Sequence, residues 1–217
     1  MIVALRRVRL FLLMVAAVCA ALWGLWGLAR SQRHWVVLGI AAQSPHHLEL
    51  PDEGALPDFA LRDEQGGAFT RASLAGNVWV ADFIFTRCAG QCPMMSGEMA
   101  RLQRRWDHAP GVSFVSFSVD PSHDTPDVLA AYAQRYGANT NRWRFVTGES
   151  HTVEHLIREG FHLAFGPAAS RQEPITHSVR FVLIDQRGHL RGSYEATDAR
   201  TMRRLDHDLQ RLIRAGP

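Results

Sequence analysis

A nearly continuous apolar run from Val78 to Phe85 is interrupted only by Asp82. Runs of this length are typical of a strand that is buried on both faces of a sheet. Before it, Phe59 to Leu61 and Ala68 to Thr70 flank the polar, glycine-containing segment Glu64 to Gly67. This pattern predicts a β-hairpin that precedes the buried strand.

Helical and extended patterns alternate after that run. From Ser96 to Trp106, apolar residues recur at spacings of three and four, which is the period of one helix face. Strand and helix units that end in an antiparallel hairpin and a last helix match the order of a thioredoxin fold. The predicted fold class is therefore α/β, thioredoxin-like, with an added N-terminal β-hairpin. The remaining predicted strands are Val112 to Val119, Trp143 to Val146, Val179 to Ile184 and Leu190 to Tyr194, and the remaining helices are Asp124 to Tyr136, Ser150 to Glu159 and Asp198 to Arg214.

The segment Leu10 to Ala29 has no charged residue and is long enough to cross a bilayer as one transmembrane helix. Arg6, Arg7 and Arg9 precede it, and basic residues of this kind usually stay in the cytoplasm. A cleaved signal peptide is the alternative, because Val18 to Ala20 resembles a cleavage site. The apolar run continues past that site, which favours an uncleaved anchor.

The chain is accordingly divided into a cytoplasmic stub (1–9), a transmembrane anchor (10–29), a tether (30–54) and one domain (55–217). This orientation predicts a bacterial inner-membrane protein whose domain faces the periplasm or the outside. All 24 basic residues are arginine. Without the four in the anchor region, the chain has 20 arginines and 21 acidic residues. This near balance gives no reason to expect nucleic-acid binding.

Cys88 and Cys92 are the cysteines of the predicted exported domain, since Cys19 lies in the anchor. The sequence Cys-Ala-Gly-Gln-Cys-Pro joins a buried strand to a helix, where unpaired backbone N–H groups favour a thiolate. Arg87 adds a neighbouring positive charge. A static disulfide is the weaker alternative for so reactive a position.

Three residues between the cysteines leave a loop that is open enough for both sulfurs to face one ion. Thiolates are soft ligands that select Cu(I). An imidazole from elsewhere in the chain would complete a three-coordinate site that also holds Cu(II).

Four motifs together resemble the Sco/SenC family over the region from about Pro57 to the C-terminus. They are the strand Val78 to Thr86, the cysteine motif Cys88 to Pro93, the loop Ser118 to Pro126 (SVDPSHDTP) and the segment Thr176 to Ser178. The combination and its order are more specific than any one motif.

The resemblance implies a copper site in which Cys88 and Cys92 supply sulfur and His177 supplies nitrogen. It also implies a copper metallochaperone that serves the binuclear copper centre of cytochrome c oxidase, with copper held as Cu(I) or Cu(II). The expected partners are the oxidase's copper-bearing subunit, another copper chaperone or thiol reductase, and the membrane. Ala89 departs from the family, because many members carry proline there.

Three carboxylates are candidates for supporting roles. Asp82 stands six residues before Cys88, the offset at which thioredoxins keep a buried carboxylate, and it could relay a proton. A carboxylate that is simply satisfied by local hydrogen bonds is the alternative. Asp120 and Asp124 belong to the loop motif. Asp124 is expected to cap the following helix. The family resemblance implies that both lie near the metal site.

The main alternative is a membrane-tethered thiol-disulfide oxidoreductase that reduces cysteines of an oxidase subunit. It would use Cys88 and Cys92 as the redox pair and Asp82 as the proton relay, but it gives His177 no role. A peroxidase is a weaker hypothesis, because the residues before Cys88 lack the Pro-x-x-x-Thr-x-x-Cys pattern of peroxiredoxins. The chain is therefore expected to be primarily a metal carrier and not an enzyme.

Overall fold

The computed structural model describes residue 23 and residues 50–167, 175–177 and 179–216. The predicted stub, anchor and most of the tether lie outside the described residues, apart from Trp23, which is helical and exposed. Among the residues described, no helix is both long and apolar enough to cross a membrane. The unit presented below begins at Leu50.

A seven-stranded mixed sheet forms the centre of this unit. Its strands are β1 (Ala60–Asp63), β2 (Ala68–Thr70), β3 (Val78–Ile84), β4 (Val112–Ser118), β5 (Trp143–Thr147), β8 (Arg180–Ile184) and β9 (Leu190–Glu195). They are ordered β2-β1-β5-β4-β3-β8-β9. All seven residues of β3 are buried, as its apolar run predicts. β3 lies parallel to β4 and antiparallel to β8, so the cysteine motif follows a central strand.

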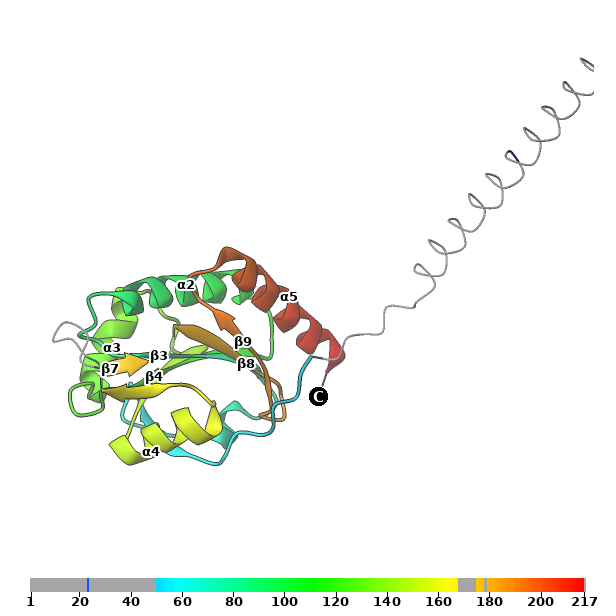
Figure 1. The fold of residues 1–217 in the computed structure, drawn as a ribbon. Coiled ribbons are helices and arrows are strands. Elements are labelled where there is room, and N and C mark those ends of the chain that lie inside the picture. The colour runs from blue at the N-terminus through cyan, green and yellow to red at the C-terminus, as the bar shows by residue number, and fades with distance from the viewer. Residues whose placement is uncertain (1–22, 24–49, 168–174, 178, 217) are drawn as a thin grey trace, which may run out of the picture. The chain divides into compact units, whose positions relative to one another are not determined.

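Helices cover both faces of the sheet. They are α2 (Gln91–Trp106), α3 (Pro126–Arg135), α4 (Ser150–His155) and α5 (Ala199–Ala215), with a 3-10 turn η1 (Arg71–Leu74) and a π-helical turn η2 (Leu156–Gly160). Figure 1 shows α2 and α5 together on one face and α4 on the opposite face. α3 packs beside α2 through a buried hydrogen bond of 3.0 Å between the Ser96 and Tyr132 hydroxyls. This arrangement confirms the thioredoxin-like α/β prediction with its added hairpin β1–β2.

α2 begins at Gln91, so Cys92 lies within its first turn, as expected for a cysteine motif at a helix start. One local feature differs from the sequence prediction. A separate two-stranded sheet, β6 (Phe165–Pro167) and β7 (Ile175–His177), was absent from the prediction. Strands of three residues are too short to give a recognisable alternation of apolar and polar positions.

The chain enters the described unit at the end of the sheet opposite to the cysteines. The N–H of Glu53 donates to the carbonyl of Leu190 at 3.0 Å, and the N–H of Leu190 donates to the carbonyl of Gly54 at 2.9 Å. Leu190 begins β9, which runs in the same direction as β3 because each is antiparallel to β8. The start of β9 and the start of β3 therefore share one end, whereas Cys88 follows the end of β3.

Candidate metal centre

Both cysteines lie where β3 ends and α2 begins. Cys88 is 8% exposed, Cys92 is fully buried, and both are free thiols. The N–H of Cys92 is directed at Cys88 Sγ at 3.5 Å, and the N–H of Cys88 donates to the carbonyl of Phe85 at 3.1 Å. Pro93 suits the first turn of α2, where a backbone N–H would have no partner within the helix. The loop thus holds two sulfur donors together and shields them from water.

The Cys92 thiol is strongly perturbed. Burial raises its pKa far above the usual range, and the neighbouring Cys88 and Asp82 raise it further. The expectation that the helix N-terminus favours a thiolate is therefore wrong for Cys92, because desolvation of the charge outweighs the helix dipole. Cys92 is a protonated thiol in the metal-free protein, and a metal ion that binds it must displace the proton.

Arg87 ties the cysteine loop to the loop after β4. Its Nε and Nη2 atoms both donate to Asp120 Oδ2, the first at 3.2 Å. The hydrogen bond with Asp120 raises the pKa of Arg87. The hydroxyl of Ser122 donates to the other oxygen of Asp120 at 2.9 Å. The positive charge beside Cys88 is thus largely compensated by Asp120, and the expected supporting role of Asp120 is one of positioning.

Asp124 also holds the cysteine loop. Its buried carboxylate accepts hydrogen bonds from the Thr86 hydroxyl at 2.6 Å, the Thr86 N–H at 3.2 Å and the Ser118 hydroxyl at 2.6 Å. The expectation that Asp124 caps the next helix is wrong, because its side chain turns inward. Thr125 is the cap, and its hydroxyl accepts from the N–H of Val128 at 3.5 Å. The hydrogen-bond partners of Asp124 are thus Thr86 and Ser118, which sequence reasoning did not single out.

Replacing Asp124 with alanine is expected to lower the free energy of unfolding by about 3 kcal/mol, because it leaves buried donors on Thr86 and Ser118 without partners. Urea unfolding of the reduced, metal-free chain measures this. Asp127→Ala, an exposed change in the first turn of α3, is the matched control and should shift stability by about 1 kcal/mol or less. Equal effects of the two changes would show that Asp124 does not anchor the loop.

Asp82 is completely buried in β3, and neither of its carboxylate oxygens has a hydrogen-bond partner among the described residues. Burial raises the pKa of Asp82 to about 7, and the Ser116 hydroxyl at the paired position of β4 offsets part of this rise. That hydroxyl accepts a hydrogen bond from Trp143 Nε1 at 2.9 Å, and it does not reach Asp82 with hydrogen-bonding geometry. Asp82 is thus a buried group that titrates near neutral pH within electrostatic range of Cys92.

His177 is the last residue of β7, where its backbone pairs with Phe165 of β6. Its side chain lies outside what the structure describes, so its role as the third ligand stays a prediction. Within the described ranges, no three histidine, cysteine, aspartate or glutamate side chains gather as a metal-binding group. The donors that the structure does bring together are the two sulfurs, and soft sulfur donors suit copper.

The profile of the SCO1/SenC family matches residues 50–214, which is most of the chain. The chain belongs to the SCO1/SenC family. The match spans the cysteine loop, the Asp120 and Asp124 loop, and His177. The family resemblance drawn from the sequence motifs is therefore confirmed.

Three proteins to which this chain is similar illustrate the match. A protein of Stutzerimonas stutzeri, named as a proposed copper-binding protein, is 31% identical over 69% of this chain and 73% of its own length. The crystal structure of a SCO1/SenC lipoprotein of Bacillus anthracis is 32% identical, with a TM-score of 0.67 over 76% of this chain and 96% of that one. The structure of BsSco, described as a cytochrome c oxidase assembly protein with a disulfide switch, is 27% identical, with the same TM-score and coverage.

Proposed function

We propose that this SCO1/SenC protein is a copper metallochaperone that delivers copper to the binuclear centre of cytochrome c oxidase during assembly. Cys88, Cys92 and His177 hold the ion. The observation that carries the proposal is the pair of buried free cysteines, with the N–H of Cys92 directed at the Cys88 sulfur at the end of a central strand. The similarity to a protein named for copper binding and to an oxidase assembly protein supports it.

The site combines soft and intermediate donors. Two thiolates favour Cu(I), and the imidazole of His177 lets the same site hold Cu(II). Ligand exchange with cysteines and histidines of the oxidase's copper-bearing subunit passes the ion on. Another copper chaperone or a thiol reductase supplies the copper or keeps the cysteines reduced.

Membrane attachment serves this transfer. We propose that residues 10–29 anchor the chain in the bacterial inner membrane, with the domain on the periplasmic or outer side, and the B. anthracis relative is described as a lipoprotein. Glu53 and Gly54, which precede the domain, pair with Leu190 at the end of the sheet opposite to Cys88. Holding donor and acceptor in one membrane raises their effective concentration, so a modest docking affinity suffices.

A second candidate function is thiol-disulfide exchange with cysteines of an oxidase subunit. The specific observation that favours it is Asp82, a buried carboxylate without a hydrogen-bond partner among the described residues. Its pKa is raised to about 7, and it interacts electrostatically with Cys92. Such a group can accept the proton that a thiol must lose before it attacks a disulfide. The disulfide switch described for BsSco fits the same chemistry.

Changing His177 to alanine separates the two functions. We expect His177→Ala to weaken copper binding by the reduced full-length chain by about 100-fold or more, since even indirect supports of metal ligands are worth 10–100-fold. Oxidation and reduction of Cys88 and Cys92 should be nearly unchanged, because exchange depends on the thiols and a proton acceptor. Anaerobic titration with Cu(I) measures the first, and the rate of reduction by dithiothreitol measures the second.

His108→Ala is the matched control, because His108 is an exposed histidine in the turn after α2, and its copper affinity should equal that of the unaltered chain. If His177→Ala binds copper as tightly as this control and still assembles active oxidase, the assigned ligand set is wrong. The thiol-disulfide function would then take its place.

A further inference from the structure

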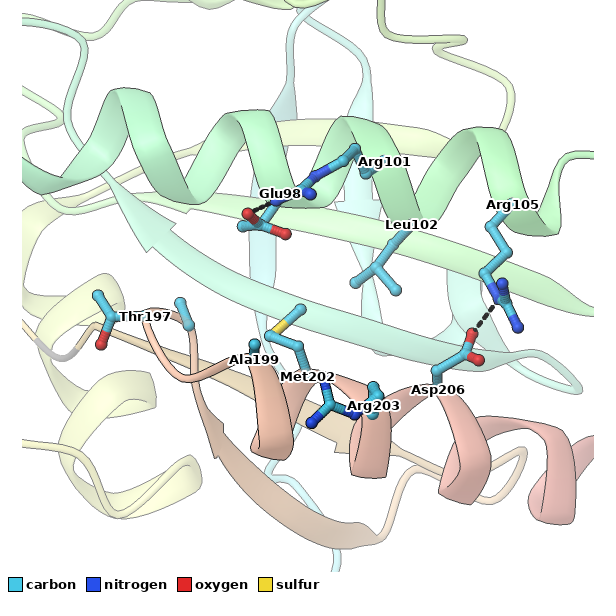
Figure 2. Close-up of a pocket in the computed structure, with 10 residues that line it drawn as sticks. Glu98, Arg101, Leu102, Arg105, Thr197, Ala199, Met202, Arg203 and Asp206 are labelled. Atoms are coloured by element: carbon cyan, nitrogen blue, oxygen red, sulfur yellow. Dashed lines mark hydrogen bonds and ion pairs between the residues drawn. The ribbon is translucent and has the colours of Figure 1, made fainter.

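A groove with a volume of about 600 Å³ lies between α2 and α5. In Figure 2, Leu102 of α2 and Met202 of α5 point toward each other across it. Ala196 and Ala199 line the groove near the start of α5, and their short side chains leave the space between the helices unfilled. The groove therefore offers a small apolar floor.

Polar contacts tie the helices together at one end of the groove. Asp206 of α5 accepts hydrogen bonds from Arg105 Nε at 2.7 Å and from Trp106 Nε1 at 2.8 Å (Figure 2). At the other end, the lining residues are Glu98 of α2 and Thr197 of the loop before α5. No such cross-link joins that pair among the described contacts.

This second end lies on the cysteine side of the molecule. Glu98 is six residues after Cys92, roughly 9 Å along the axis of α2. Thr197 follows β9, which runs in the same direction as β3, so it lies at the end of the sheet where β3 leads into Cys88. A partner seated in the groove would thus reach toward the two cysteines.

The rim of the groove presents positive charge. The side chains of Arg101 and Arg105 are 64% and 67% exposed, whereas the carboxylates that pair with them, on Glu98 and Asp206, are 21% and 22% exposed. Arg203 is exposed at the rim, and no described carboxylate forms an ion pair with it. The guanidinium groups face solvent while the carboxylates are sheltered.

Positive charge is concentrated on α2 and α5, whereas the rest of the domain has more acidic than basic residues. α2 and α5 together carry eight arginines and three carboxylates. The rest of residues 50–217 carries eleven arginines and seventeen carboxylates. Charge is therefore segregated onto the two helices that form the groove, and such a face attracts anionic partners from a distance.

We propose that this groove is the docking site for an acidic segment of a partner protein, with an apolar side chain seated on Leu102 and Met202 and carboxylates paired with Arg203 and its neighbours. Its role in placing a copper or thiol partner beside the cysteines rests on the proposed function. A protein segment fits better than an anionic membrane, because the apolar floor is concave and lies between two helices. Side chains can enter such a groove, whereas a flat layer of headgroups cannot reach its floor.

Binding of a designed peptide tests the site. The probe is a labelled 16-residue helical peptide with leucine on one face and glutamate elsewhere, and its fluorescence anisotropy is measured with the full-length chain in non-ionic detergent. Arg203→Glu should weaken binding by about tenfold or more, as expected for a charge that contacts the ligand. Arg104→Glu is the matched control, because it makes the same charge change on α2 outside the groove lining, and its effect should be several-fold smaller. A peptide with lysine in place of glutamate should not bind.

Two results would overturn the site: the acidic peptide does not bind, or Arg203→Glu and Arg104→Glu weaken its binding equally. If the peptide does not bind, phosphatidylglycerol vesicles are tested, and the informative outcome is vesicle binding that Arg203→Glu abolishes. The last result would assign the face to a membrane. Copper titration of Arg203→Glu keeps the inferences separate, because it should match the unaltered chain. If Arg203→Glu binds both copper and the peptide normally, only the groove proposal is refuted. If the unaltered chain does not bind copper, the proposed function is refuted.

Discussion

Oxidation of Cys88 and Cys92 to a disulfide is expected to reduce copper binding from about one ion per chain to essentially none, because thiolates and not disulfide sulfurs are the metal ligands. The effect should be large, since both sulfur donors that the structure brings together are lost at once. Anaerobic titration of the full-length protein with Cu(I), before and after treatment with a thiol oxidant, measures it.

Cys19 calls for a control, because the full chain contains a third cysteine. The titration is therefore repeated with Cys19→Ala, which should bind copper when reduced and lose it when oxidised, as the unaltered chain does. Cys92→Ser should fail to bind tightly in either state. Stoichiometric, tight copper binding by the oxidised protein would refute the assignment of Cys88 and Cys92 as ligands.

Asp82→Asn is expected to raise the free energy of unfolding of the metal-free, reduced protein more at pH 8 than at pH 4, each compared with the unaltered chain at the same pH. The pKa of Asp82 is about 7 in the folded protein against a usual value of 3.8, so the folded state keeps a proton that the unfolded chain releases between these values. Stability therefore falls as pH rises through this window, by about 4 kcal/mol in total. Asparagine does not ionise, and the variant should lose most of this pH dependence.

Urea unfolding at pH 4 and at pH 8 measures the effect as a difference between the two pH values, which cancels any constant effect of the amide. Asp107→Asn is the matched control, since Asp107 is exposed after α2 and its change should leave the pH dependence as it is. An Asp82→Asn variant with the same pH dependence as the unaltered chain would show that Asp82 does not titrate between its folded and unfolded states in this way.

The charge of Asp82 lowers the stability of the fold at neutral pH, so stability does not explain why a carboxylate stands there. A role in function does. If Asp82 accepts the proton of Cys92, Asp82→Asn should slow disulfide exchange while copper affinity changes less. His177→Ala should do the reverse. The two variants thus separate the redox and metal functions of one pair of cysteines.

The sequence by itself determined the fold class, the family and the cysteine motif. The apolar run over Val78 to Phe85 is short and rich in valine, isoleucine and aromatic residues, which favours a buried strand, and the alternation of strand and helix patterns that follows is local information. The motif Cys88 to Pro93 is also local, because its place between strand and helix follows from its neighbours. These features could be predicted because each depends on residues close together in the chain.

Only the tertiary structure decided what surrounds the cysteines. Asp124 reaches Thr86 across 38 residues of sequence and so anchors the loop, where local reasoning expected a helix cap. Burial keeps Cys92 protonated, because desolvation depends on packing from the whole sheet and not on the helix N-terminus alone. The groove between α2 and α5 joins residues about a hundred positions apart, such as Arg105 and Asp206, and contacts over that separation leave no local pattern in the sequence.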